Sequence, residues 1–333
     1  MKLKVGLLGG GSWGTTVASL TSKNCPTKIW ARNSETVDEI NTYHTNEKYL
    51  PGAKLTPSLK AAPTIQETVY DADVIVMGIP AQNFRKVLEE ARPHIRPWVP
   101  IISLSKGLEN GTKLRMTQII EEVMPGHPVG VLTGPNLAKE IARGQAAASV
   151  IAMVDETIAK ALQGIFRSGL FRVYTNDDVL GCELGGALKN IMAIATGMGD
   201  GAKAGENTRA ALITRGLAEL TRLGVAMGGR PETFAGLAGM GDLVATCSSS
   251  KSRNRTVGFK LGSGMSLDEI VADMAEVAEG VKSAPVVMEL AREYKVEMPI
   301  ATEVYKVLYE GSNVQQAFRG LLKRKVGSEA DPG

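Results

Sequence analysis

The sequence predicts an α/β protein in which a Rossmann-type, doubly wound and mainly parallel sheet is followed by an all-helical domain. Two patterns of residue composition along the chain support this prediction. Over residues 1–180, short runs rich in Val and Ile alternate with amphipathic stretches of helical length, which is the pattern of parallel strands joined by crossover helices. From about residue 178 onward the chain is rich in Ala, Leu, Met and Glu and shows no further strand-like run.

The elements of the first domain are expected in alternating order. The apolar runs predict strands at 3–8, 27–31, 73–78, 100–104, 129–133, 147–154 and 171–175, and the stretches between them predict helices at 12–22, 34–44, 81–91, 113–123 and 155–167. The second domain is expected to begin with a helix from Val179 to about Ala195, and the glycines of "GMGDGAKAGEN" indicate a turn after it. We therefore place the sheet domain at 1–180, the helical domain at 181–325 and a flexible tail at 326–333.

The composition excludes several classes of protein. With 333 residues, 44% hydrophobic content and a formal net charge of +3, the chain has the profile of a soluble globular protein, and nucleic acid is not expected as a partner. The sequence opens directly on the strand-like "KLKVGLLG", and no run approaches the roughly 18 apolar residues of a membrane span. Cys25, Cys182 and Cys247 form no C-x-x-C pair, which argues against a metal site and a disulfide framework. We expect a cytoplasmic protein, with a homodimer as the base-rate assembly.

A glycine motif follows the first predicted strand. Gly9, Gly11 and Gly14 form G-x-G-x-x-G where strand gives way to helix. Dinucleotide-binding folds need these glycines for a tight turn, for close approach of the backbone to the pyrophosphate and for packing of helix on strand. Ser12 and Trp13 would stand at the helix N-terminus, where backbone N–H groups and the helix dipole favour a phosphate. The alternative is a merely Gly-rich turn, with Trp13 as a core aromatic.

The next strand ends in "WARN". An NAD site usually places Asp or Glu about 20 residues after the glycines, where it binds the ribose hydroxyls, whereas Arg accommodates the additional phosphate of NADP. Arg32 occupies that place. The motif is therefore predicted to hold NADP(H), the alternative being that Arg32 is a solvated surface side chain.

The candidate proton carrier is a lysine. Dehydrogenases need a proton donor or acceptor at the carbonyl that exchanges hydride, and His is the commonest choice. His44, His94 and His127 all precede the second domain and fall near helix ends or in a turn. Lys189 in "ELGGALKNIMAIA" instead lies among small and apolar residues, and the glycine pair one turn before it would let a nicotinamide approach the helix. A structural lysine would normally sit in a polar stripe.

Loops after two strands also carry polar groups. "SKGLE" puts Lys106 just past a strand, and "GPNLAKE" puts Gly134 and Asn136 past the next one. Open α/β sheets bind ligands at the carboxyl ends of their strands, although ordinary strand-to-helix loops would give the same pattern.

A second polar group lies in the helical domain. "GMGDL" contributes Asp242, and a run of donors follows at Ser252, Arg253, Asn254 and Arg255, before a helix-like stretch. A basic and polar run at a helix start suits a phosphate. A solvated loop would not need so many donors.

Together these motifs resemble one family. "GGGSWGT", "WARN", "SKGLE", "GPNLAKE", "ELGGALKNI", "GMGDL", "SRN" and the "EG" at 279–280 follow in this order over nearly the whole chain, and they resemble the bacterial NAD(P)-dependent glycerol-3-phosphate dehydrogenases. The resemblance implies a Rossmann domain joined to a helical substrate domain, NADP(H) or NAD(H) as cofactor, and reduction of dihydroxyacetone phosphate to sn-glycerol 3-phosphate, the entry to glycerophospholipid synthesis.

The resemblance also implies roles for single residues, with Lys189 as the proton carrier. The cofactor would be held by Gly9, Gly11, Ser12, Trp13, Gly14, Arg32, Lys106, Ala138, Arg253, Val277 and Glu279. The substrate would be held by Lys106, Gly134, Asn136, Lys189, Asp242, Ser252, Arg253 and Asn254. The sequence departs from the family pattern at Asn136, where Ser or Thr is usual, and at Asn33.

Rival interpretations come from two classes. Other β-hydroxyacid dehydrogenases and 6-phosphogluconate dehydrogenase share the two domains and the lysine, although "GMGDL" followed by "SRN" favours the triose phosphate. UDP-sugar oxidation would need a nucleophilic cysteine, for which neither Cys182 nor Cys247 has a suitable setting. A non-catalytic NADP(H) sensor would need the glycine motif, but not Lys189, Asp242 and the basic run together.

Overall fold

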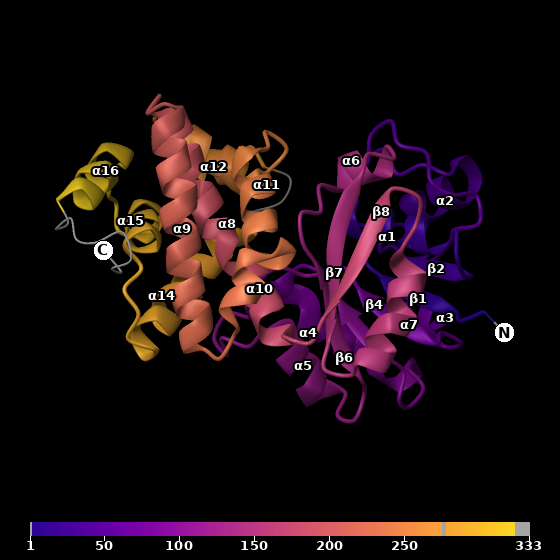
Figure 1. Cartoon of the computed structure of the whole chain (residues 1–333). Coiled ribbons are helices and arrows are strands. Elements are labelled where there is room, and N and C mark those ends of the chain that lie inside the picture. The colour runs from indigo at the N-terminus through magenta and orange to yellow at the C-terminus, as the bar shows by residue number, and fades with distance from the viewer. Residues whose placement is uncertain (1, 275–277, 324–333) are drawn as a thin grey trace. The chain divides into compact units, whose positions relative to one another are not determined.

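The computed structural model describes residues 2–274 and 278–323, and the chain divides into two compact units (Figure 1). Unit 1 contains residues 1–106 and 114–179, and unit 2 contains residues 107–113 and the chain from 180 onward. The segment 107–113 therefore belongs to unit 2, although unit 1 lies on both sides of it in the sequence. The predicted tail at 326–333 lies outside the described residues.

Unit 1 is built on one eight-stranded sheet in the order β3-β2-β1-β4-β5-β6-β7-β8. All neighbouring strands pair in parallel except β6 and β7, which are antiparallel. The doubly wound, mainly parallel sheet predicted from the sequence is confirmed. The strands are β1 (Val5–Leu8), β2 (Thr27–Trp30), β3 (Lys60–Ala62), β4 (Val74–Met77), β5 (Ile101–Ser103), β6 (Val129–Thr133), β7 (Ala147–Met153) and β8 (Phe171–Asn176).

Helices cover both faces of this sheet (Figure 1). Side chains alternate along a strand, so Leu7 and Val76 join one apolar cluster while Leu8 and Met77 join another. The helices that complete these clusters are α1 (Ser12–Thr21), α2 (Ser34–Tyr43), α3 (Ile65–Val69), α4 (Ala81–Ala91), α5 (Met116–Val123), α6 (Ala138–Ala142) and α7 (Glu156–Phe166). The sequence pattern missed β3 and α3, because elements of three to five residues are too short to show a period.

Unit 2 is helical over its described residues, as predicted. Its helices are α8 (Val179–Gly201), α9 (Glu206–Ala226), α10 (Pro231–Ala235), α11 (Asp242–Ser248), α12 (Arg253–Gly262), α13 (Leu267–Ala272), α14 (Glu279–Glu293), α15 (Pro299–Tyr309) and α16 (Val314–Leu322), with a π-helical turn at Leu237–Gly241. By length and composition α8 could cross a membrane, but 83% of its most apolar 18-residue window is buried inside the protein. We assign it to the core.

The helix α8 runs further than the sequence suggested. We predicted that the helix ends near Ala195 and that "GMGDGAKAGEN" forms the turn after it, but the helix continues through the first three glycines of this stretch to Gly201, and the turn follows at residues 202–203. A Cβ on Gly197 would stand 2.1 Å from the backbone oxygen of Arg255, and one on Gly258 of α12 would stand 2.0 Å from the oxygen of Ile194. The prediction was wrong because these glycines allow α8 and α12 to cross in backbone contact, which outweighs their low helix propensity.

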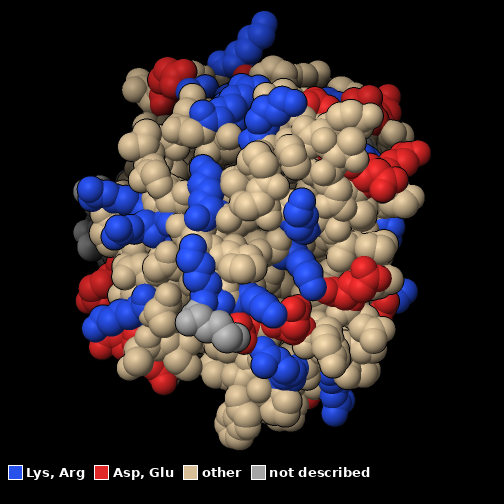
Figure 2. All heavy atoms as spheres, turned by 90° about the vertical axis from the view of Figure 1, so that its right-hand side faces the viewer, with Lys and Arg blue, Asp and Glu red and all other residues tan. Residues whose placement is uncertain are grey.

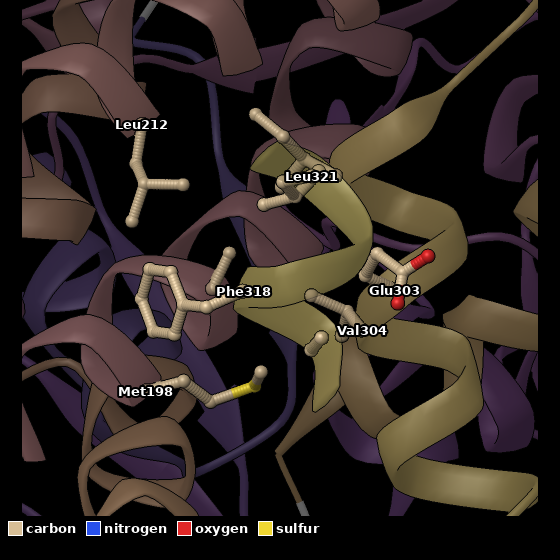
Figure 3. Close-up of a pocket in the computed structure, with 9 residues that line it drawn as sticks. Met198, Leu212, Glu303, Val304, Phe318 and Leu321 are labelled. Carbon is tan, nitrogen blue, oxygen red and sulfur yellow. The ribbon is translucent and has the colours of Figure 1, made fainter. Parts of the chain in front are cut away.

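A small apolar cavity remains between α8, α9, α15 and α16 (Figure 3). Met198, Leu212 and Phe318 are among the side chains that line it. Glu303 is the one charged residue of its lining, and its carboxylate pairs with Lys306 at 2.8 Å. The cavity is therefore a packing feature of the core of unit 2.

The surface carries both signs of charge. On the face at the right of Figure 1, Lys and Arg outnumber Asp and Glu, but acidic side chains are interleaved with them (Figure 2). Several cations of unit 1 are paired, since Lys4 and Lys28 contact Asp71 at 2.9 and 3.2 Å. This mixture fits the small net charge of +3.

The crossing of α8 and α12 gives a stability prediction. Gly197→Ala should lower the free energy of unfolding by about 1–3 kcal/mol, because the new methyl group meets backbone that cannot move aside. Gly164→Ala is the matched control, since Gly164 is exposed in α7 with nothing within 4 Å of its Cβ position, and it should be neutral or stabilising by up to about 1 kcal/mol. Urea denaturation measures both, and equal effects would contradict the packing role.

Candidate functional site

The glycine motif in unit 1 has a separate steric reason at each position. Gly9 has a φ of +122°, and a Cβ there would lie 2.3 Å from the oxygen of Gly78. Gly14 lets α1 pack on the loop, since its Cβ would lie 2.1 Å from the oxygen of Gly9. A Cβ on Gly11, in contrast, would meet nothing within 4 Å. The first and third glycines are thus required by the chain itself, whereas the space at Gly11 is available to a ligand.

The N-terminus of α1 fits the pyrophosphate of a dinucleotide. Gly11 is its N-cap and provides no side-chain cap, and the first turn contains no acidic residue. The first N–H groups of a helix have no partner within the helix and carry its positive dipole end. Trp13 adds a buried Nε1 with no hydrogen-bond partner, although its ring packs edge-on against Phe171 at 6.2 Å. Backbone donors without protein acceptors at a helix N-terminus are what an anionic ligand requires.

A loop after α2 stabilises the glycine motif through hydrogen bonds. These contacts were not predicted from the sequence. The fully buried Asn46 donates from Nδ2 to the oxygen of Gly10 at 3.0 Å and to the hydroxyl of Thr15 at 2.9 Å. Ser12 donates its hydroxyl to the oxygen of Tyr49 at 2.7 Å. These bonds fix the loop conformation before any ligand arrives. An isolated Asn in a loop has no period or motif that would reveal this role.

Arg32 lies at the edge of the sheet beside the glycine motif. The amide of Gly9 donates to the oxygen of Trp30 at 3.1 Å, and a Cβ on Gly10 would meet the Cβ of Ala31 at 2.8 Å. Arg32 is the next residue and is exposed, as is Asn33, whose side chain caps α2 by accepting from the amide of Glu35 at 2.8 Å. Arg32 thus follows the end of β2, beside the glycine motif.

Two further predicted residues meet at the same strand ends. Lys106 follows β5 and donates from Nζ to the oxygen of Gly134, which follows β6, at 2.8 Å. Asn136 accepts a hydrogen bond from Ser149, and its buried Nδ2 has no partner. Ala138 begins α6, and its oxygen accepts from Thr16 of α1 at 3.4 Å. Unit 1 therefore brings all its predicted residues to the carboxyl edge of the sheet.

The centre of unit 2 is a buried ion pair. Lys189 lies midway along α8, and its Nζ stands 2.9 Å from Oδ1 of Asp242, with side-chain exposures of 6% and 3%. Lys189 also donates to the hydroxyl of Thr246, which donates in turn to the backbone oxygen of Asp242 at 2.6 Å. Thr246 was missed in the sequence, although its place four residues after Asp242 puts both on one helix face.

Backbone packing brings Asp242 to this lysine. We predicted that the glycines before Lys189 leave room for a nicotinamide. The structure corrects this for Gly185, because a Cβ there would meet the oxygen of Ala238, in the π-helical turn, at 2.6 Å. The turn is itself compact, since a Cβ on Gly239 would lie 2.1 Å from the oxygen of Phe234. Gly185 therefore leaves room for the π-helical turn, which places Asp242 next to Lys189.

The predicted phosphate-binding run begins α12. Ser252 is its N-cap, and its hydroxyl accepts from the amide of Arg255 at 3.3 Å. Arg253 is exposed at the first helical position. Asn254 is buried, donates to Asn190 of α8 at 2.9 Å and accepts from the amide of Gly280 at 2.9 Å. The Asn254 side chain thus ties α12 to α8 and α14, a role that sequence reasoning did not foresee.

Two predicted residues remain, and the structure describes one of them. Glu279 is its first residue. Val277 lies outside the described residues. The predicted site residues thus fall into two sets, one gathered within unit 1 and one within unit 2.

The cysteines have no setting for nucleophilic chemistry. Cys25, Cys182 and Cys247 are buried and unbridged. Cys247 lies on α11 next to Thr246, and burial raises the pKa of its thiol to about 11, although a hydrogen bond with Thr196 acts in the opposite direction. A thiol with such a pKa is protonated at neutral pH. This agrees with the exclusion of a cysteine-dependent oxidation.

Comparison with known proteins decides the family. The model for the N-terminal part of NAD-dependent glycerol-3-phosphate dehydrogenase matches residues 4–159, and the model for its C-terminal part matches residues 178–319. The chain belongs to the NAD-dependent glycerol-3-phosphate dehydrogenase family. The resemblance predicted from the motifs is thereby confirmed.

Similar members of the family span the whole chain. A glycerol-3-phosphate dehydrogenase [NAD(P)+] 2 of Sphingopyxis alaskensis is 65% identical over 333 residues, 100% of both chains. A glycerol-3-phosphate dehydrogenase [NAD(P)+] of Mycobacterium avium is 56% identical over 98% of this chain and 96% of its own. The crystal structure of glycerol-3-phosphate dehydrogenase from Coxiella burnetii is 38% identical, covers 97% of this chain and 99% of its own, and has a TM-score of 0.92.

Cys247 gives the prediction that tests this site without turnover. In the native protein at pH 8 it should not be alkylated by iodoacetamide, because it is fully buried and only about a thousandth of such thiols are ionised at that pH. Mass mapping after labelling in urea should show full modification. Rapid labelling of Cys247 in the folded protein would contradict the burial described here.

Proposed function

We propose that the protein is an NAD(P)H-dependent glycerol-3-phosphate dehydrogenase, which reduces dihydroxyacetone phosphate to sn-glycerol 3-phosphate. The observation that carries the proposal is Lys189, an ammonium buried at 6% exposure against Asp242 in a chain that matches this family over both of its parts. Such a reaction places the protein among the oxidoreductases that act on a CH–OH group. Its product is the entry to glycerophospholipid synthesis.

The residues of unit 1 would hold the cofactor. The glycine motif and the start of α1 bind the pyrophosphate, and Arg32 binds the 2′-phosphate that distinguishes NADP(H) from NAD(H). Lys106 and Ala138 complete this set. When bound, the reduced cofactor supplies the hydride for the reaction.

The residues of unit 2 would hold the substrate. Its phosphate is a dianion that suits Arg253, the Ser252 hydroxyl and the N-terminus of α12. Binding energy from this non-reacting group also positions the C2 carbonyl for reaction. The family resemblance also assigns Gly134 and Asn136 to substrate binding and Glu279 to cofactor binding.

Lys189 would carry the proton. Reduction adds a hydride to C2 and a proton to the C2 oxygen. The Lys189 ammonium donates this proton as charge develops on the oxygen, and in the reverse direction the neutral amine accepts it from the C2 hydroxyl. Asp242 and Thr246 hold Nζ in one place, which is the orientation that such proton transfer requires. We further propose that the enzyme acts in the cytoplasm as a homodimer.

The direct test is the fall in NADPH absorbance when dihydroxyacetone phosphate is added to the purified protein, repeated with NADH. Turnover that depends on both reactants supports the proposal. No turnover with either cofactor, in a protein that binds NADPH, would favour the non-catalytic sensor.

Lys189→Ala should lower kcat by about two to four orders of magnitude, the range for loss of a general acid. The Kd for NADPH, measured by fluorescence titration, should stay within a few-fold of that of the unaltered protein, which would show that the variant is folded. Lys189→Arg should fail as well, because a guanidinium does not release its proton at any usable pH. Normal turnover in a folded Lys189→Ala variant would remove this lysine from the mechanism.

Arg32→Ala should weaken NADPH binding by about tenfold to a hundredfold, since a charge-assisted bond to phosphate contributes about 1.5–3 kcal/mol. NADH binding should hardly change. Arg172→Ala, which removes another exposed cation of unit 1, is the matched control for net charge. Equal losses for the two cofactors would show that Arg32 does not recognise the 2′-phosphate.

A further inference from the structure

One member of the basic run is held in an ion pair with another helix. Arg255, in the first turn of α12, directs Nε and Nη2 at Oδ2 of Asp200, at 2.8 and 2.7 Å. Asp200 is the penultimate residue of α8, and its side chain is 8% exposed. Two nitrogens of one guanidinium on a single carboxylate oxygen restrict both the distance and the orientation of the Arg255 side chain. Arg255 is therefore an anchor rather than a free phosphate ligand.

The carboxylate of Asp200 is satisfied from both sides. Its Oδ1 accepts from Nε of Arg209 at 2.8 Å and lies 2.6 Å from Nη2 of the same guanidinium. Arg209 belongs to α9 and also pairs with Glu206 at 2.6 Å. Asp200 thus links α8 to α9 and α12. Of these two links, the one to Arg255 connects Asp200 with the predicted phosphate-binding run.

The ion pair of Arg255 with Asp200 restrains the turn that contains the proposed phosphate-binding residues. The backbone amide of Arg255 donates to the hydroxyl of the N-cap residue Ser252 at 3.3 Å. The backbone oxygen of Arg255 packs against Gly197, since a Cβ on Gly197 would lie 2.1 Å from it. The Arg255 side chain is fixed by Asp200. Arg255 is thereby held at three points, and Arg253 is two residues away in the same turn.

We propose that Asp200 is a positioning residue for the phosphate end of the substrate. By fixing Arg255 it holds the first turn of α12, and with it Ser252 and Arg253, in the geometry that receives the phosphate. It also keeps the Arg255 guanidinium from competing for that anion. The inference rests on the proposed function, because it assumes that this turn binds a phosphorylated substrate.

The test compares Asp200→Asn with the unaltered enzyme on dihydroxyacetone phosphate and on unphosphorylated dihydroxyacetone. The variant keeps the shape of the side chain but loses its charge. We expect the KM for the phosphorylated substrate, and the Kd for inorganic phosphate by calorimetry, to rise about tenfold or more. Values of kcat/KM for dihydroxyacetone and of KM for NADPH should stay within about twofold. Arg253→Ala provides the reference profile for direct loss of the phosphate contact.

Arg209→Gln is the matched control. It removes the other partner of Asp200 but leaves the Arg255 contact, so it should lower the melting temperature without the phosphate-specific change. Equal losses on both substrates in Asp200→Asn, or no loss, would overturn the proposal. So would a phosphate-specific loss of the same size in Arg209→Gln.

A second variant covers the case in which Asp200→Asn does not fold. Arg255→Lys keeps the charge but offers Asp200 one nitrogen in place of two, and it should show a smaller loss confined to the phosphorylated substrate and inorganic phosphate. A loss shared with dihydroxyacetone would again overturn the proposal. If the unaltered protein does not reduce dihydroxyacetone phosphate at all, the proposed function fails, and the calorimetric comparison with inorganic phosphate still decides the role of Asp200.

Discussion

The burial of the Lys189 ammonium is the constraint on which unit 2 depends. A charged group removed from water is tolerated only when it is paired and hydrogen-bonded, and removal of one partner from a buried pair typically costs about 3–5 kcal/mol. Asp242 at 2.9 Å and the hydroxyl of Thr246 meet this demand. A salt bridge so deep in a core is seldom the most stable solution, since apolar residues of equal volume often do as well. Its presence fits a chemical role better than a purely structural one.

Glycines make this pairing geometrically possible. Gly185 admits the π-helical turn that ends at Asp242, and Gly197 and Gly258 admit the crossing of α8 with α12. Gly280 has a corresponding place at the start of α14, where a Cβ would lie 2.8 Å from the oxygen of Asn190. The π-helical turn before Asp242 and the first turn of α12 thus both pack against the backbone of α8. These close backbone contacts leave the Asp242 carboxylate and the predicted phosphate-binding turn little freedom to shift.

The sequence predicted the two-part architecture and the proton carrier because both leave strong local signals. The alternation of Val-rich and Ile-rich runs with helices survives in the observed sheet, and Lys189 stood out as a charge among small and apolar residues. Contacts between distant segments were beyond such patterns. Nothing local to Gly197 distinguishes a packing glycine from a turn glycine, and Asn46, Asn190 and Asp200 acquire their roles only from partners remote in the sequence.

Chemical rescue of Lys189→Ala is the measurement that most directly tests whether Lys189 transfers a proton. Primary alkylamines small enough to enter the space left by the side chain should restore turnover in proportion to their concentration, with a rate that follows the amine pKa as general acid catalysis requires. Tetramethylammonium, which carries the charge but has no proton to donate, should not restore it. Equal rescue by tetramethylammonium, or no rescue by any primary amine, would contradict the account.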